Sequence, residues 1–324
     1  MVDDVHAGSW LAMGCTVDVV IVGGHPGLLD SARSSIDHLE RCWSRFLPDS
    51  DISRLNHAEG SPVQVEPSTV ILLRAMVDGW RATEGAFDPT LLAPLVGLGY
   101  EASWHDPSVV TSLPHAAMSR SDLDQLSIDD EISVVTIPGG SCLDAGGIGK
   151  GLAADMVVAE LLATGVRGAS VSIGGDVAVA GAAPQPGSWL IGVADPTDLD
   201  VEASQLALVW GGVATSGTLR RRWRDRDGAM VHHLLDPATR RPAHHHREIV
   251  AATVIAGTAA WAEVWTKAVM VRGVMMLPVL DRFALGAQVT YADTATTVNT
   301  TWSNFAVSGQ RGDPVGDVTG MVEA

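Results

Sequence analysis

Hydrophobic residues recur every three or four positions in four parts of the chain, which is the spacing of an amphipathic α-helix. The first pattern predicts a helix over 29–46, with an apolar face of Leu29, Ala32, Ile36, Leu39, Trp43 and Phe46. The others predict helices from about 70 to 85, directly after residue 151, and from Thr258 to about Arg272. Runs of β-branched and apolar residues predict strands, at 17–22, 126–128, 132–137, 169–173, 177–180, 189–193, 206–210 and 249–256.

Two segments show neither pattern. Residues 48–56 are mostly polar and are expected to form a loop, and residues 101–125, rich in Ser, Pro, His and Asp, are expected to form a surface excursion. A length of 324 residues is compatible with two domains or with one large domain of two lobes. Periodicity by itself supports only an alternation of strands and helices.

Composition and charge argue against several classes of protein. The net charge of −17 disfavours nucleic acid or an anionic membrane surface as a partner. The longest weakly polar run, near 249–262, is too short to span a bilayer. The three cysteines include no C-x-x-C pair, so neither a disulfide framework nor a cysteine zinc site is indicated. The first residues lack the features of a secretory signal, and we expect a cytoplasmic protein without stable membrane insertion.

The segment 144–151, Asp-Ala-Gly-Gly-Ile-Gly-Lys-Gly, points most directly to a ligand. Glycine lets a ligand approach bare backbone amides, and a helix that begins directly after the loop directs its N-terminal dipole at that ligand. This arrangement favours a phosphate. The segment has neither the G-x-x-x-x-G-K-[ST] spacing nor a G-x-G-x-x-G fingerprint. A tight strand-to-helix turn without a ligand is therefore the alternative.

Only two of the 21 basic residues are lysines, Lys150 in the glycine-rich loop and Lys267 in the last predicted helix. Arginine is used elsewhere, which indicates that a compact ammonium group suits these two places better than a guanidinium group. Lys267 lies four residues after Glu263, on the same helix face. The flanking residues are apolar, which predicts a largely buried pair that needs a further partner. The alternative is an ordinary exposed pair worth only ~0.3–0.5 kcal/mol.

Taken together, these segments resemble the FAD:protein FMN transferase (ApbE) family, whose members split FAD and attach FMN to a threonine or serine of an acceptor flavoprotein. The resemblance implies an α+β fold of mixed or antiparallel sheets with packed helices, in which FAD lies in the cleft between two lobes. Residues 1–324 are then expected to form one two-lobed domain. The resemblance spans most of the chain and is carried by motifs at 13–16, 49–56, 87–90, 144–155 together with 174–176, 214–217 and 233–237.

The resemblance also implies roles for individual residues. Lys150, the loop amides and either a magnesium ion or Lys267 would supply positive charge to a phosphoryl-transfer transition state. His233 matches the histidine that accepts the hydroxyl proton, and an ordinary pKa near ~6.5 would suit that role. His232 is the less suitable base, because neighbouring strand residues face opposite ways. The implied flavin site consists of Met13, Phe46, Ala86, Phe87, Asp88, Asp144, Lys150, Gly174, Gly175, Asp176, Ser216 and Leu235.

The family's magnesium ion is held by a backbone carbonyl, here near Gly147, and by an Asp and a Thr four residues apart on the last helix. This sequence departs from that pattern, because Glu263 stands at the Asp position and Lys267 at the Thr position. Glutamate can ligate magnesium, but a protonated lysine has no lone pair to offer. Either the ammonium group of Lys267 replaces the metal, or magnesium binds toward Glu263 and Thr266. We expect a weakened or altered metal site.

Two other functions stay open at this point. If water replaces the acceptor hydroxyl, the same site is an FAD pyrophosphatase that yields FMN and AMP. If the exchange at positions 263 and 267 has removed catalysis, the chain is a non-catalytic FAD-binding protein. A serine hydrolase is disfavoured because the sequence contains no G-x-S-x-G motif. The sequence carries no motif that identifies the acceptor protein.

Overall fold

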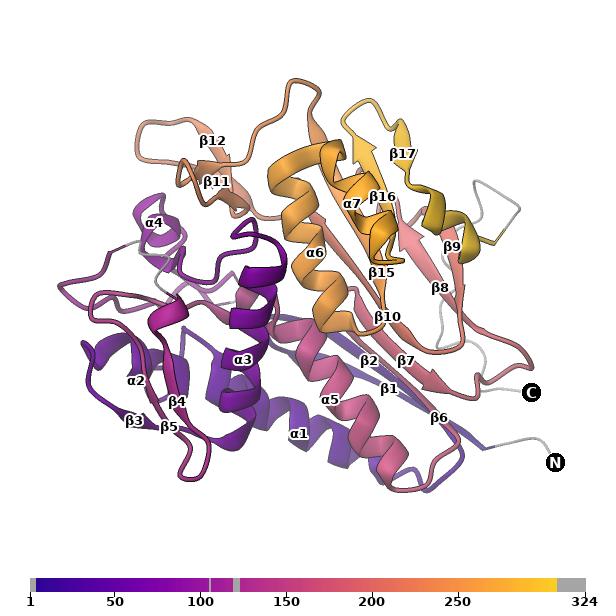
Figure 1. Cartoon of the computed structure of the whole chain (residues 1–324). Coiled ribbons are helices and arrows are strands. Elements are labelled where there is room, and N and C mark those ends of the chain that lie inside the picture. Colours follow the sequence, from indigo (N-terminus) through magenta and orange to yellow (C-terminus); the bar gives the residue numbers. More distant parts are fainter. Residues whose placement is uncertain (1–3, 105, 119–122, 308–324) are drawn as a thin grey trace.

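The centre of the fold is an antiparallel sheet of eight strands (Figure 1); the computed structural model describes residues 4–104, 106–118 and 123–307. Every neighbouring pair in this sheet is antiparallel, so the predicted α+β class with antiparallel sheets is confirmed. The strands, in spatial order, are β1 (Val5–Ala12), β2 (Cys15–Val22), β6 (Gly168–Ile173), β7 (Asp176–Gly181), β10 (Gly211–Gly217), β15 (Ile249–Ala256), β16 (Gly286–Tyr291) and β17 (Thr296–Val298).

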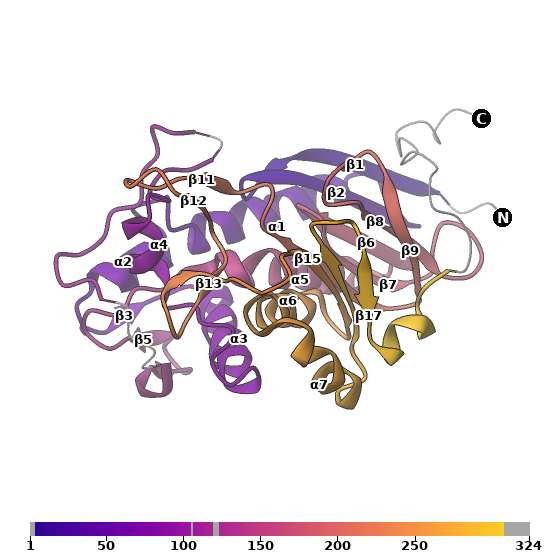
Figure 2. The same ribbon diagram turned by 90° about the horizontal axis from the view of Figure 1, so that it is seen from above.

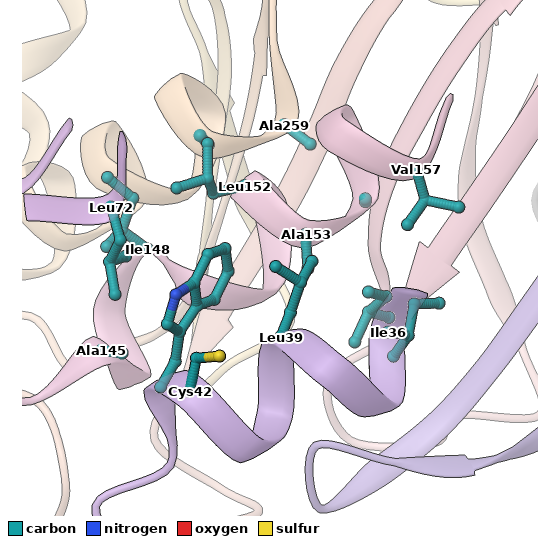
Figure 3. Close-up of a cluster of buried hydrophobic side chains, with 14 of the residues drawn as sticks. Ile36, Leu39, Cys42, Leu72, Ala145, Ile148, Leu152, Ala153, Val157 and Ala259 are labelled. Carbon is teal, nitrogen blue, oxygen red and sulfur yellow. The ribbon is translucent and has the colours of Figure 1, made fainter. Parts of the chain in front are cut away.

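Three helices cover one face of the sheet: α1 (Leu28–Trp43), α5 (Gly149–Ala163) and α6 (Ala259–Arg272) (Figures 1 and 2). Helix α5 is buried on most sides because it contacts α1, α6, β6 and β7. Ile36 and Leu39 of α1 belong to the same buried cluster as Ala153 and Val157 of α5 (Figure 3). This packing places the glycine-rich loop, which leads into α5, on a rigid support.

The N-terminal ends of α5 and α6 meet at Gly151. A Cβ at this position would lie 2.5 Å from the carbonyl oxygen of Ala259, so the close approach of the two helices requires glycine. Asp155, one turn further along α5, accepts 2.8 Å hydrogen bonds from the amides of Ala259 and Ala260. These bonds cap the first turn of α6. The helices that carry the two lysines are thereby fixed to each other.

Replacing Asp155 with asparagine is expected to lower the free energy of unfolding by about 1–2 kcal/mol. An amide side chain has one acceptor oxygen, so it keeps one of the two capping bonds and places its NH₂ group against the other helix amide. Urea unfolding at pH 7.5 measures the change. Asp18→Asn, an exposed position on β2, is the control and is expected to stay within about 0.5 kcal/mol of wild type. An Asp155 variant as stable as this control would contradict the capping role.

The other face of the sheet is covered by a hairpin of β8 (Trp189–Ala194) and β9 (Glu202–Leu208), together with the 3₁₀ helix η4 (Thr300–Asn304). Trp189, Leu206 and Trp302 are buried there against strands of the large sheet. Helix α6 is followed by η3 (Gly273–Met276) and α7 (Leu277–Arg282). The large sheet is therefore covered on both faces.

A search of the described helices for a membrane-spanning segment finds none with the required length and hydrophobicity.

A second group of elements lies beside the layered part, on the side of α1 and α5 (Figures 1 and 2). Its helices and its three-stranded sheet are α2 (Asp51–His57), α3 (Pro67–Ala82), α4 (Leu92–Gly97), η1 (Leu123–Gln125), β3 (Val63–Gln64), β5 (Val134–Thr136) and β4 (Ser127–Asp129). The short elements near its junction with the large sheet are η2 (Ala145–Gly147), β11 (Arg222–Arg224), β12 (Met230–His232), β13 (Leu235–Asp236) and β14 (Arg241–Pro242). The expectation that residues 1–324 form a single domain stays a prediction. The expected surface excursion over 101–125 is described only in part, because residues 105 and 119–122 lie outside the described residues.

The loop prediction for 48–56 is wrong, because this segment contains α2. Ser50 caps the helix by accepting a hydrogen bond from the Ser53 amide, 3.1 Å away. The polar residues that suggested a loop are turned inward: Asp51 accepts bonds from the Glu66 amide and the Thr69 hydroxyl. The predicted strand at 206–210 is also corrected, since β9 ends at Leu208.

Candidate functional site

A cavity of about 370 Å³ opens where the two groups of elements meet, and it gathers most of the residues that the sequence singled out. Its wall includes Met13, Phe46, Ala86, Phe87, Asp88, Asp144, Gly147, Lys150, His233, Leu235 and Lys267. The other predicted site residues do not line it: Gly174, Gly175 and Asp176 lie at the turn from β6 to β7, Ser216 lies on β10, and Glu263 and Thr266 lie on α6.

Tight backbone turns position two of the lining residues. Met13 and Gly14 form the two-residue connection between β1 and β2, and both have positive φ, 50° and 66°. Positive φ at both positions is typical of a type I′ hairpin turn. Asp88 precedes a proline and accepts hydrogen bonds from the amide and hydroxyl of Thr90, at 2.8 and 2.6 Å. Both side chains are thus held at the cavity by local backbone geometry.

The glycine-rich loop is stabilised mainly by its own first residue. Asp144 accepts a 2.9 Å hydrogen bond from the Gly146 amide, and its own amide donates to the carbonyl of Pro89 at 2.9 Å. The Gly151 amide donates at 2.9 Å to Glu263. At least four amides of residues 144–151, those of Asp144, Gly146, Ile148 and Gly151, therefore donate hydrogen bonds within the protein. Fewer amides than the sequence indicated are available to a phosphate.

Arg45 is a cavity residue that the sequence interpretation missed. Its guanidinium group is buried, lies 3.4 Å from Asp144 Oδ2, and donates to the hydroxyl of Thr111 at 2.8 Å. It also lies over the rings of Phe46 and Tyr100, 4.3 and 4.8 Å from their centroids. An arginine after an apolar helix carries no local signal of such a role, because the hydrogen-bond acceptors of its guanidinium group lie 55 or more positions away.

Two lysines and two carboxylates form a buried cluster beside the cavity. Lys150 Nζ forms an ion pair with Asp176 and lies 3.0 Å from Glu263 Oε1. Lys267 Nζ lies 3.1 Å from the same oxygen. The amide of Thr215 donates to the remaining oxygen of Asp176 at 3.3 Å. The cluster, Lys150, Asp176, Glu263 and Lys267, is referred to below as the lysine–carboxylate cluster.

Burial and charge shift the pKa values in this cluster in opposite directions. Burial disfavours the charged form of Lys150, but Asp176 and Glu263 outweigh that effect and raise its pKa. Burial would raise the pKa of Glu263, yet the two ammonium groups and the Gly151 amide lower it to about 2. For Lys267, burial outweighs the attraction of Glu263 and lowers the pKa.

The ammonium groups, and not the carboxylates, face the cavity. The side chains of Lys150 and Lys267 are 20 % and 15 % exposed, whereas those of Asp176 and Glu263 are 2 % and 0 % exposed. Of the four residues of the cluster, the two lysines belong to the cavity wall and the two carboxylates do not. The floor of the cavity therefore offers positive charge to an anionic ligand, as a pyrophosphate would require.

The residues expected to bind magnesium are engaged in other contacts. Both carboxylate oxygens of Glu263 are taken, one by the two lysines and one by the Gly151 amide. The Thr266 hydroxyl donates to the Glu263 carbonyl at 2.6 Å and is 2.7 Å from the Ser216 hydroxyl. Among the described residues, no group of three or more His, Cys, Asp or Glu side chains could hold a metal ion. This arrangement does not fit magnesium.

His233 lines the cavity, and its Nδ1 lies 3.4 Å from the carbonyl oxygen of Arg221. Nδ1 as donor to this carbonyl leaves Nε2 as the acceptor. Burial, together with the nearby Arg221 and Lys267, lowers its pKa to about 3. The expectation of an ordinary pKa is therefore wrong. The neighbouring His232 lines a separate cavity of about 310 Å³, together with Arg222, Pro242 and His245.

Comparison with known proteins identifies what this chain is similar to. The family model described as "ApbE family" matches residues 13–284. An FAD:protein FMN transferase of Salmonella typhimurium is 29% identical over 249 residues, covering 74% of this chain and 70% of its own. The crystal structure of the ApbE protein from Thermotoga maritima has a TM-score of 0.81 at 25% identity, covering 94% of this chain and 100% of its own. The apo form of Pseudomonas stutzeri flavinyl transferase ApbE has a TM-score of 0.78 at 25% identity, covering 95% and 98%.

Proposed function

The chain belongs to the ApbE family, and from this we propose that it is an FAD:protein FMN transferase. It cleaves the pyrophosphate of FAD, attaches FMN to a threonine or serine hydroxyl of an acceptor flavoprotein, and releases AMP. FAD is the substrate. The cytoplasmic location expected from the sequence stays a prediction.

One observation carries the proposal: a single cavity combines an apolar, aromatic wall with two ammonium groups and a neutral histidine. Ligand pockets of a few hundred Å³ typically pair an apolar lining with a few placed polar groups. Met13, Phe46, Phe87 and Leu235 supply surfaces against which the flat isoalloxazine ring can pack. The ammonium groups then meet the pyrophosphate.

The reaction needs positioning and charge neutralisation more than covalent help from the protein. The acceptor oxygen forms a bond to the flavin-side phosphorus while the bond from that phosphorus to the bridging oxygen breaks. AMP leaves with the bonding electron pair, and the hydroxyl proton passes to Nε2 of His233. Lys150 and Lys267 hold the phosphoryl oxygens, whose negative charge also raises the proton affinity of the histidine.

A magnesium ion near Gly147, Glu263 and Thr266 is the other source of positive charge that the sequence left open. Such an ion would neutralise phosphate charge as a Lewis acid. The contacts of Glu263 and Thr266 leave no free carboxylate or hydroxyl oxygen of this set directed at the cavity. In the proposed reaction the two lysines, and not a metal ion, supply the positive charge.

The test is to incubate the purified protein with FAD and with candidate acceptor flavoproteins encoded by the same organism. We expect flavin fluorescence bound covalently to one acceptor, a mass gain corresponding to FMN, and one AMP per acceptor labelled. An acceptor with its target threonine replaced by alanine is the control. AMP and free FMN formed at one rate with or without an acceptor would favour the pyrophosphatase, and FAD that stays intact throughout would favour a non-catalytic binding protein.

A further inference from the structure

The lysine–carboxylate cluster is electrically balanced without any metal. Two ammonium groups face two carboxylates, and both ammonium groups approach the same oxygen, Glu263 Oε1, at 3.0 and 3.1 Å. A divalent ion on this oxygen would lie beside two positive charges in a buried site, where such repulsion is only weakly screened. It would displace at least one lysine from its buried partner.

The side chain of Lys267 already occupies the space next to the loop from which a metal-binding carbonyl was expected. A Cβ on Gly147 would lie 3.8 Å from Lys267 Cε and 2.9 Å from the ring of Phe87. A side chain at position 147 would meet the end of the lysine stem at an ordinary van der Waals distance, and it is the ring of Phe87 that requires glycine there. Lys267 and Phe87 thus lie beside the loop from which a metal-binding carbonyl was expected.

The hydrogen bonds of Lys267 leave it free to bind an anion. An ammonium group has three donors, and in the described part of the chain Lys267 uses one of them on a carboxylate, whereas Lys150 uses two. Lys267 can therefore reach a phosphoryl oxygen while it stays paired with Glu263. Asp155 of α5 braces the first turn of α6, and this helps to hold Lys267 in place at the cavity.

We propose that the ammonium group of Lys267 serves as the cation that neutralises the pyrophosphate, so that this protein transfers FMN without a divalent metal ion. The inference rests on the proposed function and specifies how its phosphate site works. Glu263 acts as the positioning residue for Lys267, and Lys150 completes the site.

The first experiment measures AMP formation from FAD and acceptor in excess EDTA and in magnesium chloride. The same rate in both supports the inference. A rate that falls about 10²-fold or more in EDTA and returns with magnesium overturns it, since that is the loss expected when a transition-state charge stabiliser is removed. Titration calorimetry with magnesium alone should give no binding heat, and a stoichiometric site that needs Glu263 would also overturn it.

Two variants test whether Lys267 is the group that supplies this positive charge. Lys267→Met keeps an unbranched side chain one atom shorter than lysine and removes the charge, and it should slow the reaction about 10²–10³-fold in EDTA. Glu263→Asp with Lys267→Thr installs the acid and hydroxyl pair that the family pattern carries, and it should make AMP formation depend on magnesium. Circular dichroism and thermal unfolding establish that both variants are folded. Full activity of Lys267→Met in EDTA would overturn the proposal.

A failure of the proposed function is distinguishable from a failure of this inference. If no AMP forms under any condition, the transferase proposal fails, and FAD binding followed by flavin fluorescence then decides the role of Lys267. Binding that is equal in EDTA and magnesium, and that Lys267→Met weakens, supports the inference. Binding that requires magnesium overturns it.

Discussion

Replacing Lys150 with methionine is expected to abolish AMP formation from FAD and to lower the free energy of unfolding by about 3–5 kcal/mol. Lys150 is the ammonium partner of Asp176, whose side chain is 2 % exposed and keeps only the Thr215 amide in the described contacts. Burial already raises the pKa of Asp176, and loss of Lys150 raises it further. The deficit in stability is therefore full near neutral pH and shrinks as the pH falls and this carboxyl group takes up a proton.

A double variant separates the structural role of Lys150 from its role in the reaction. Lys150→Met with Asp176→Asn removes both charges and keeps the acceptor for the Thr215 amide, so urea unfolding should recover much of the lost stability. AMP formation should stay absent. Recovery of activity in the double variant would show that Lys150 acts only on stability. If Lys150→Met alone were as stable as wild type, the buried pairing of Lys150 with Asp176 would be contradicted.

Replacing His233 with alanine is expected to slow FMN transfer about 10²–10⁴-fold while FAD binding stays nearly unchanged, because a general base acts on the hydroxyl proton and not on the flavin. Single-turnover transfer and fluorescence titration with FAD measure the two quantities. His232→Ala is the matched control, since that ring lies in the other cavity, and it should retain transfer. Lost FAD binding with retained transfer would contradict the assignment.

The pH dependence of the same variant tests the environment of His233. The folded-state pKa of about 3 lies below the ordinary value of 6.5, so the unfolded chain takes up a proton first as the pH falls. The free energy of unfolding of the wild type should therefore fall between pH 7 and pH 5, by up to ~2 kcal/mol because of this group. In His233→Ala this part of the loss should be absent. Equal losses in the two proteins would mean that His233 is accessible to protons in the folded state.

The sequence predicted the helices with a clear apolar face more reliably than the polar segments. The patterns at 29–46 and near Thr258 correspond to α1 and α6, which pack on the large sheet. Helix α2 was missed because its polar residues bond to distant backbone, as in the 2.7 and 2.9 Å bonds between Asn56 and Leu143. Strand β1 was missed because most of its residues are exposed or half-buried on the edge of the sheet.

In the candidate site, too, local motifs were informative and contacts between residues distant in sequence were missed. The motifs brought attention to residues such as Met13, Asp88 and Asp144, which the structure gathers around one cavity. Arg45 was missed because its role depends on Tyr100 and Thr111, which are distant in sequence. The proton affinity of His233 was misjudged because burial sets it, and a single sequence does not reveal how deeply a histidine is enclosed.

By itself, the sequence determined the family, through that resemblance an α+β fold of mixed or antiparallel sheets, and the unusual use of lysine at positions 150 and 267. These follow from local patterns, residue choice and motif order. Only the tertiary structure decided that both lysines converge on Glu263, and that this carboxylate is buried behind them. Lys150 and Glu263 are 113 positions apart, so their contact depends on how α5 and α6 pack. The electrostatics of the site arise from that packing and from the burial it produces.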